Sequence, residues 1–341
     1  MTMKTKAVLA ATAVGAAVLI RNLKNRQPDR SFLGQVVLIT GGSKGLGLQM
    51  AREFGRRGAR LAICARDSAE LDRAKGDLER RGYEVLPVTC DVTEEHQVRD
   101  MVRQVIARYS RVDVLVNNAG AIHVGPLESM QAADFKNAMD VIFWGTLYPT
   151  LAVMPSYIAR QSGKIVNISS IGGKVSVPHL APYSAAKFAV AGLSESLRSE
   201  LAKHNVTVTA IFPGLMRTGS YRNAQFRGDA AAEEGWFSTG AQLPGLTLSA
   251  GRAARMIADA TRDGVNERVL GAPAWTLDRA HSLFPAKTME LLTAAATVLL
   301  PAITGRGPVR GSALRKVAGP ALKMLLWAGQ RTAKSLNQGA A

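Results

Sequence analysis

Short apolar runs alternate with longer segments of helical periodicity through most of the chain. Runs rich in β-branched residues between turn residues predict strands, and apolar positions that recur every three or four residues predict helices. Helices are predicted over Leu48–Arg57 and Ser68–Arg81. Strands are predicted over Val36–Thr40, Arg60–Ala65, Val85–Thr89, Val112–Val116, Lys164–Ser169, Thr207–Phe212 and Arg268–Leu270. This alternation indicates an α/β fold: a doubly wound parallel sheet with helices on both faces and right-handed crossovers.

The N-terminal segment, residues 1–30, does not show this alternation of strands and helices. Its apolar run Ala7–Ile20 lies between Lys4 and Lys6 on one side and further basic residues on the other, and no small-residue cleavage site follows it. We interpret it as a membrane anchor, with a helix packed on the domain as the alternative. The basic residues after Ile20 favour a catalytic domain, residues 31–280, that faces the cytoplasm.

The C-terminal extension, residues 281–341, also loses the alternation. Met289–Leu300 is nearly all apolar, Gly305–Gly311 is typical of a flexible basic linker, and Pro320–Leu336 predicts a basic amphipathic helix. Such a helix suits a membrane surface. Equally, it suits a cover over a substrate pocket or a contact with a partner subunit in a homo-oligomer.

Composition narrows the class of protein. The chain has 341 residues, of which 47% are apolar and 20% are charged. It therefore has enough apolar residues to form a packed core. Its net charge of +17 is concentrated at the ends, with +5 in residues 1–30 and +7 in residues 281–341. That distribution, without any base-reading motif, argues against nucleic acid and for an anionic membrane surface. Cys64 and Cys90 form no disulfide framework, which suits a reducing compartment.

A glycine-rich turn, Thr40–Gly47, joins the first predicted strand to the first predicted helix. Its glycines permit a tight turn and let backbone N–H groups approach a pyrophosphate, and the helix N-terminus attracts anions. In this strand–turn–helix context the motif predicts a Rossmann-type dinucleotide site. The candidate contacts are Gly41, Ser43, Lys44, Gly45, Leu46 and Gly47.

The end of the second predicted strand bears on the choice of dinucleotide. An acidic residue there accepts from the ribose 2′-hydroxyl of NAD, whereas an arginine pairs with the 2′-phosphate of NADP. Arg66 follows this strand and Lys44 lies in the glycine turn, so we expect NADP (NADPH). Asp67, one residue further on, keeps NAD open as the alternative.

The ordered motifs of the chain resemble those of the short-chain dehydrogenases/reductases (SDR), over about Gly34–Ala280. The resemblance implies that Asp91, followed by Val92, contacts the adenine ring and that Asn117 steadies the sheet beside the cofactor. It further implies that Thr218 lies near the nicotinamide carboxamide. The motifs are the glycine turn, Asp91-Val92, Asn117-Asn118-Ala119-Gly120, Ser170, Tyr183 with Lys187, and Pro213-Gly214.

Ser170, Tyr183 and Lys187 are the candidate catalytic residues. Tyr183 and Lys187 are four positions apart, so they share one face of a helix. An ammonium near a phenol lowers the pKa of that phenol, which lets Tyr183 act as acid in reduction and as base in oxidation. The Ser170 hydroxyl can polarise a carbonyl, with Ser169 as a neighbouring candidate that the family spacing disfavours. The resemblance also implies a bond from Lys187 to the nicotinamide ribose.

Ile142 stands where the family often has an asparagine. Its side chain cannot hold a water for a proton relay behind Lys187, so proton supply takes another route, turnover is slow, or the chain has lost catalysis. The last option keeps a second function open, a membrane-associated NADP-binding scaffold or sensor. His123 and His179 are interpreted as loop residues near the pocket, and no spacing of ligands predicts a metal site.

The segment Gly219–Leu246 is expected to form a mobile lid over the substrate. It contains four aromatic residues, which predict a partly apolar pocket: Tyr221, Phe226, Trp236 and Phe237. Together with the two membrane-seeking ends, this pattern favours a small lipophilic carbonyl or alcohol as substrate. The predicted activity is therefore the NADP(H)-dependent interconversion of a lipophilic ketone or aldehyde and its alcohol.

Overall fold

The computed structural model describes residues 29–243, 245–301, 309–310, 333 and 335–338. The predicted anchor run Ala7–Ile20 lies outside the described residues. So does most of the predicted amphipathic helix Pro320–Leu336, of which Ala333, Ser335 and Leu336 are described.

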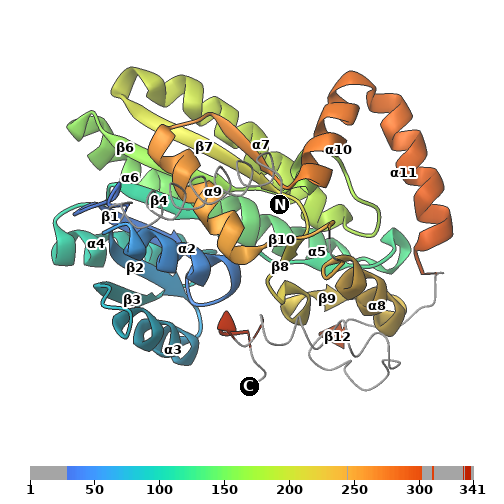
Figure 1. Cartoon of the computed structure of the whole chain (residues 1–341), viewed down its shortest axis with the longest axis horizontal. Helices are drawn as coiled ribbons and strands as arrows, with labels where there is room; N and C mark the ends of the chain where they lie inside the picture. The colour runs from blue at the N-terminus through green and yellow to red at the C-terminus, as the bar shows by residue number, and fades with distance from the viewer. Residues whose placement is uncertain (1–28, 244, 302–308, 311–332, 334, 339–341) are drawn as a thin grey trace, which may run out of the picture.

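A seven-stranded parallel sheet forms the centre of the described chain, in the order β11-β7-β6-β4-β1-β2-β3 (Figure 1). This topology confirms the predicted doubly wound α/β fold. Three strands have the predicted bounds: β1 (Val36–Thr40), β2 (Arg60–Ala65) and β3 (Val85–Thr89). The others shift by one or two residues: β4 (Val114–Asn117), β6 (Gly163–Ile168), β7 (Val206–Pro213) and β11 (Glu267–Leu270).

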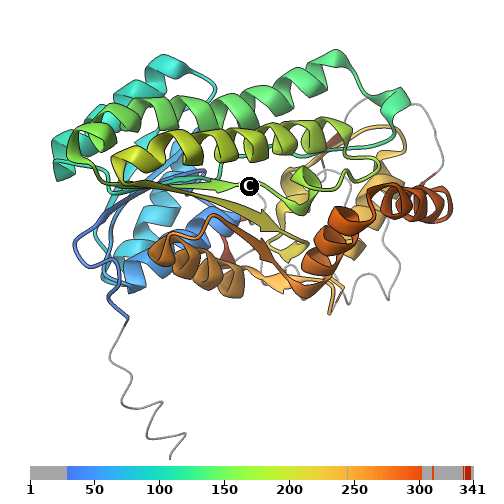
Figure 2. The same ribbon diagram turned by 90° about the horizontal axis from the view of Figure 1, so that it is seen from above.

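Alternate side chains of each central strand enter two separate cores, because successive residues of a strand point to opposite faces. In β1, Val37 and Ile39 join the core that contains Phe54 and Ile257, whereas Val36 and Leu38 join the other. Figure 2 shows these two helical layers above and below the sheet. One layer consists of α2 (Gly45–Arg56), α3 (Ser68–Glu79) and α9 (Ala250–Asp263); the other consists of α4 (Glu95–Tyr109), α6 (Gly145–Arg160) and α7 (Ala181–Leu201).

Short elements follow the carboxyl ends of the strands, where the site residues gather. They are β5 (His123–Val124), η1 (Leu127–Ser129), α5 (Ala132–Ala138), the π-helical turn η2 (Met139–Trp144), η3 (Ile171–Gly173) and β8 (Met216–Arg217). Further along lie η5 (Ser220–Asn223), β9 (Gln225–Phe226), α8 (Ala230–Gly240) and β10 (Leu248–Ser249), while η4 (Ala202–His204) follows α7. The predicted lid thus has a defined secondary structure.

One expectation for the C-terminal extension is wrong in part. Within the predicted flexible linker Gly305–Gly311, Val309–Arg310 form strand β12, which pairs antiparallel with β9. Pairing with β9, the middle strand of the sheet β12-β9-β5, supplies these two residues with backbone hydrogen-bond partners. The glycine and proline content of the linker did not predict a strand there. The rest of that linker lies outside the described residues.

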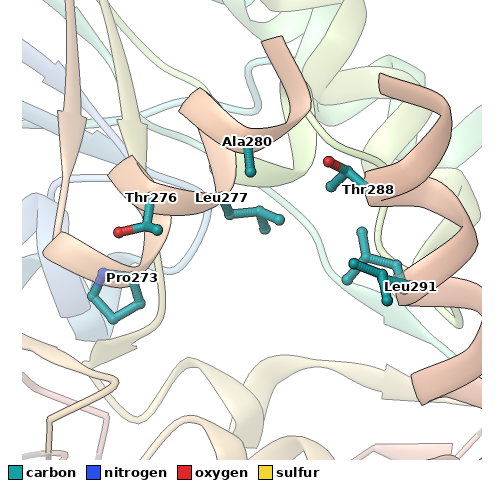
Figure 3. A pocket seen from close by; sticks show the side chains of 7 residues that line it. Pro273, Thr276, Leu277, Ala280, Thr288 and Leu291 are labelled. Atoms are coloured by element: carbon teal, nitrogen blue, oxygen red, sulfur yellow. The ribbon is translucent and has the colours of Figure 1, made fainter. Parts of the chain in front are cut away.

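Two further helices, α10 (Ala272–Leu283) and α11 (Pro285–Leu299), form a hairpin at one edge of the molecule (Figure 1). A cavity of about 480 Å³ separates them, and Figure 3 shows Leu277 and Leu291 on its two sides. By length and composition, one continuous helical stretch of the described chain, Ala132–Arg160, is apolar enough to cross a membrane. That stretch packs against α4 and α7 in the fold, as core helices of water-soluble domains also do.

Candidate active site

The glycine loop between β1 and α2 is held tightly against the sheet. Gly41 has a φ of +64°, and a Cβ added to Gly47 would lie 2.1 Å from the carbonyl oxygen of Gly41. Neither position tolerates a side chain without movement of the backbone. The loop therefore brings the N-terminus of α2, which has no side-chain cap, to the carboxyl edge of the sheet, as a dinucleotide pyrophosphate requires.

Two residues that the sequence reasoning did not assign support this loop. The side-chain amide of Asn118 donates to the carbonyl oxygens of Thr40 (3.0 Å) and Gly41 (3.1 Å). The hydroxyl oxygen of Thr40 accepts from the backbone N–H groups of Asn118 (2.9 Å) and Ala119 (3.1 Å). These bonds join the end of β1 to the end of β4. In the sequence, the pair of asparagines before Ala119 and Gly120 is the feature that could have indicated this supporting role.

Asn117 is the last residue of β4, and Asp91 lies two residues after the end of β3. The buried amide of Asn117 donates to Asn167 Oδ1 (2.9 Å) and Thr150 Oγ1 (3.1 Å), which links β4, β6 and α6. Asp91 Oδ1 accepts from the backbone and the hydroxyl of Thr93, so the turn after β3 has a fixed shape. The neighbouring Val92 is buried in the core.

Asp67, Arg66 and Lys44, which the sequence related to the choice of dinucleotide, each have a partner in the structure. Asp67, which the sequence left open as a ribose ligand, caps α3 instead, where its carboxylate accepts from the Glu70 backbone N–H at 2.9 Å. Arg66 is 71% exposed at its side chain, with Asp91 3.7 Å away. Lys44 is less available than expected, because it forms a 2.6 Å ion pair with Glu70.

The geometry separates the two candidate serines after β6. The hydroxyl of Ser169 is buried and donates to the backbone carbonyl of Lys187 at 2.9 Å, so it is a packing contact with α7. Ser170 Oγ accepts from Gly172 N–H at 3.1 Å and lies near enough to Tyr183 to lower the pKa of that phenol. The structure thus brings Ser170, and not Ser169, together with the candidate phenol.

Tyr183 and Lys187 lie on the face of α7 that covers the end of β6. The Lys187 ammonium is buried, donates to the Ile168 carbonyl at 2.7 Å and lies 5.6 Å from the centre of the Tyr183 ring. Burial lowers the pKa of Lys187 to about 8. Burial also raises the pKa of Tyr183 above its usual range, and the nearby Ser170 hydroxyl opposes that shift only in part. The expected lowering of the Tyr183 pKa is therefore wrong for this structure, because desolvation sets the direction of the shift.

Comparisons with known proteins identify the family of the chain. The family described as short chain dehydrogenase matches residues 35–226. The chain belongs to the short-chain dehydrogenase/reductase family. It is similar to dehydrogenase/reductase SDR family member 7B of Danio rerio, with 33% identity over 222 residues that cover 63% of this chain and 72% of that protein.

Solved structures of this SDR fold superpose on most of the chain. A short-chain dehydrogenase from Streptomyces avermitilis has a TM-score of 0.66 at 30% identity and covers 77% of this chain and 99% of its own. A variant of actinorhodin polyketide ketoreductase with NADPH has a TM-score of 0.62 at 32% identity and covers 70% of this chain and 95% of its own.

The remaining expected cofactor residues of this SDR chain lie at the end of β7. Pro213 ends that strand, and Gly214 N–H donates to the Leu270 carbonyl at 2.9 Å, which holds the turn against β11. Thr218 is buried, and its hydroxyl accepts from Ser220 N–H at 3.3 Å. These contacts place Thr218 at the start of the lid.

Ile142, the departure from the usual SDR asparagine, is buried in η2 and packs with Ala138, Ala186 and Val190 behind the catalytic face of α7. Its backbone carbonyl accepts from the Thr146 hydroxyl at 2.7 Å. An apolar side chain thus fills the space where the family often has an amide.

Of the two histidines expected in loops, His179 lies in a turn and His123 lies in a strand. His123 is buried within β5, and burial lowers its pKa. His179 has a φ of +61° just before α7, and its Nδ1 lies 2.8 Å from the buried carboxylate of Glu233 in α8. Trp236 Nε1 donates to the same carboxylate at 2.6 Å. Glu233, which the sequence analysis missed, therefore links the lid to the start of the catalytic helix.

The described residues hold no cluster of metal ligands.

The two serines provide the first test. Ser170→Ala removes the hydroxyl that contacts Tyr183 and should lower kcat for carbonyl reduction on the order of a hundredfold, with little change in melting temperature. The matched variant Ser169→Ala should keep most of the activity and lose about 1 kcal/mol of unfolding free energy, because its hydrogen bond is structural. NADPH absorbance and thermal melts measure both effects. Loss of activity in Ser169→Ala alone would reverse the assignment.

Proposed function

We propose that this protein is an NADPH-dependent reductase of lipophilic ketones or aldehydes. The observation that carries the proposal is the meeting of Ser170, Tyr183 and Lys187 at the carboxyl end of β6, beside the glycine loop. A Cβ added to Gly120, in the loop after β4, would lie 3.9 Å from Lys187 Nζ, so the catalytic ammonium borders the expected cofactor groove.

Each catalytic side chain has its own role in the reduction of a carbonyl. Bound NADPH supplies the hydride that the carbonyl carbon accepts. Tyr183 donates its phenolic proton to the carbonyl oxygen, and solvent later returns a proton to the phenolate. The Tyr183 phenol, whose pKa is raised by burial, is protonated near neutral pH, which is the form that donates a proton. Ser170 is placed to orient the carbonyl oxygen beside that phenol.

Lys187 stabilises the charge that this step creates. With a pKa of about 8 it is still mainly a cation at neutral pH. An ammonium has three N–H donors, one of which is bonded to Ile168, so it retains donors for the nicotinamide ribose. The phenolate that forms when Tyr183 gives up its proton would lie next to this positive charge.

The lid supports a lipophilic substrate. Tyr221, Phe226 and Phe237 are buried together, and Tyr183 and Trp236 pack against the same apolar cluster. Tyr183 therefore borders an apolar cluster, which favours a substrate with a hydrocarbon group beside its carbonyl.

Tyr183→Phe tests the activity. The variant should bind NADPH as the unmodified protein does and lose at least a thousandfold in kcat, because only the proton-donating oxygen is removed. A screen of lipophilic ketones and aldehydes, followed by NADPH absorbance, identifies the substrate for this comparison, and fluorescence titration measures cofactor binding. Turnover near that of the unmodified protein would overturn the proposed role of Tyr183.

We propose NADPH rather than NADH because Arg66 exposes its guanidinium at the end of β2 while Asp67 is occupied as a helix cap. Arg66→Asp should weaken NADPH binding at least tenfold and leave NADH binding within about twofold, because it replaces attraction for the 2′-phosphate with repulsion. Equal losses for both dinucleotides, measured by fluorescence titration, would show that Arg66 does not bind that phosphate.

We further propose that the protein attaches to an anionic membrane surface with the catalytic domain on the cytoplasmic side. Six large apolar side chains of the α10–α11 hairpin are exposed, with Leu291 at 72% and Leu299 at 72%. The others are Trp275, Leu283, Phe284 and Val298. The chain after Pro301 carries seven basic and no acidic residues, a charge that complements anionic headgroups beside an apolar face.

A pair of hairpin substitutions tests the attachment. Leu291→Glu with Leu299→Glu should reduce binding of the full chain to phosphatidylserine-containing vesicles at least tenfold, as measured by co-sedimentation. Leu127→Glu, at a side chain that is 63% exposed in η1, is the matched control and should bind as the unmodified chain does. Unchanged binding of the double variant would show that the hairpin does not contact lipid.

A further inference from the structure

The C-terminal segment, defined here as Ala333 and Ser335–Gln338, lies directly on the glycine loop. The Leu336 carbonyl accepts from the Gly45 N–H at 2.9 Å. The Asn337 amide donates to the backbone carbonyls of Ser43 and Glu70, each at 3.0 Å. Leu336 is 2% exposed. The segment is thus packed into the fold at this loop.

Three arginines from different elements hold the same segment. Arg52 of α2 donates to the Ser335 carbonyl at 2.6 Å, and Arg73 of α3 donates to Asn337 Oδ1 at 3.0 Å. On the other side, Arg222 of η5 donates to the Gln338 carbonyl at 2.9 Å. The C-terminal segment therefore reaches from the adenosine side of the expected cofactor groove to the lid.

This contact uses a group that the cofactor needs. Gly45 is the first residue of α2, and its N–H is one of the donors that a helix N-terminus leaves for an anion. A single N–H cannot make a full hydrogen bond to the Leu336 carbonyl and to a phosphate oxygen at once. The Gln338 side chain also blocks approach, since its amide lies 2.7 Å from where a Cβ of Gly45 would be.

We propose that the C-terminal segment is an internal competitor of the dinucleotide, an autoinhibitory contact that must open before the pyrophosphate reaches α2. The inference rests on the proposed function in that it takes the glycine loop as the cofactor site. Opening and cofactor binding are linked, because the apparent dissociation constant equals the intrinsic constant divided by the open fraction.

The decisive comparison is between the full chain and a chain that lacks residues 333–341. NADPH binding, measured by fluorescence titration, should tighten at least fivefold on truncation. Equal or weaker binding would overturn the proposal, since weaker binding would make the segment a strap that closes over the cofactor.

Hydrogen exchange separates this inference from the proposed function. Without cofactor, the Gly45 amide should be protected in the full chain and lose that protection on truncation. An unprotected Gly45 amide in the full chain would overturn the internal competitor alone. Failure of both chains to bind NADPH, with Gly45 still protected, would overturn the proposed cofactor and the competition with it.

A matched pair of asparagine variants removes the need for truncation. Asn337→Ala deletes the side-chain bonds to Ser43, Glu70 and Arg73 at a residue with a φ of +57°, and should tighten NADPH binding two- to fivefold. Asn205→Ala is the control: Asn205 has a φ of +55°, and its amide donates to the Gln161 carbonyl at the end of α6. Tighter binding in both variants, or in neither, would contradict a specific role for Asn337.

Discussion

The first backbone N–H groups of α2 have no partner within the helix, and much of the site is arranged around them. They must be brought to the carboxyl edge of the sheet, which requires the close approach of Gly47 to Gly41. That approach is stable because Asn118 and Thr40 join the end of β1 to the end of β4. The same requirement for a partner explains why a carbonyl from the far end of the chain bonds Gly45.

A second constraint is the burial of Lys187. A buried cation costs free energy unless it is hydrogen-bonded, and the lowered pKa reports that cost. The Ile168 carbonyl offsets part of it and fixes the ammonium at the end of β6. Because Ser169 bonds the backbone of the same helix residue, the strand and α7 are joined at two points. Ser170, the next residue, is thereby left to contact Tyr183.

The sequence predicted the central sheet well, because each strand is a short apolar run between turn residues. It also singled out Ser170, Tyr183 and Lys187, since motif order and helical spacing are local properties. It could not show that burial raises the pKa of Tyr183, or that Lys44 pairs with Glu70, since these depend on side chains brought together by folding. The pairing of Val309–Arg310 with β9 and the contact of Leu336 with Gly45 join residues far apart in the chain, so no local pattern reveals them.

The strength of the C-terminal contact follows from opposing terms of similar size. At least six hydrogen bonds hold the segment to the fold; the three from arginines contribute about 1.5–3 kcal/mol each, and the other three contribute about 1 kcal/mol each. Ordering its five described residues costs about 1–2 kcal/mol each in backbone entropy. The free energy of these hydrogen bonds and the cost of ordering the backbone nearly cancel before the burial of Leu336 is added. The segment is therefore held weakly. A phosphate accepts charge-assisted hydrogen bonds, which are roughly twice as strong as those of a neutral carbonyl. The contact can therefore reduce the affinity for a dinucleotide without preventing its binding.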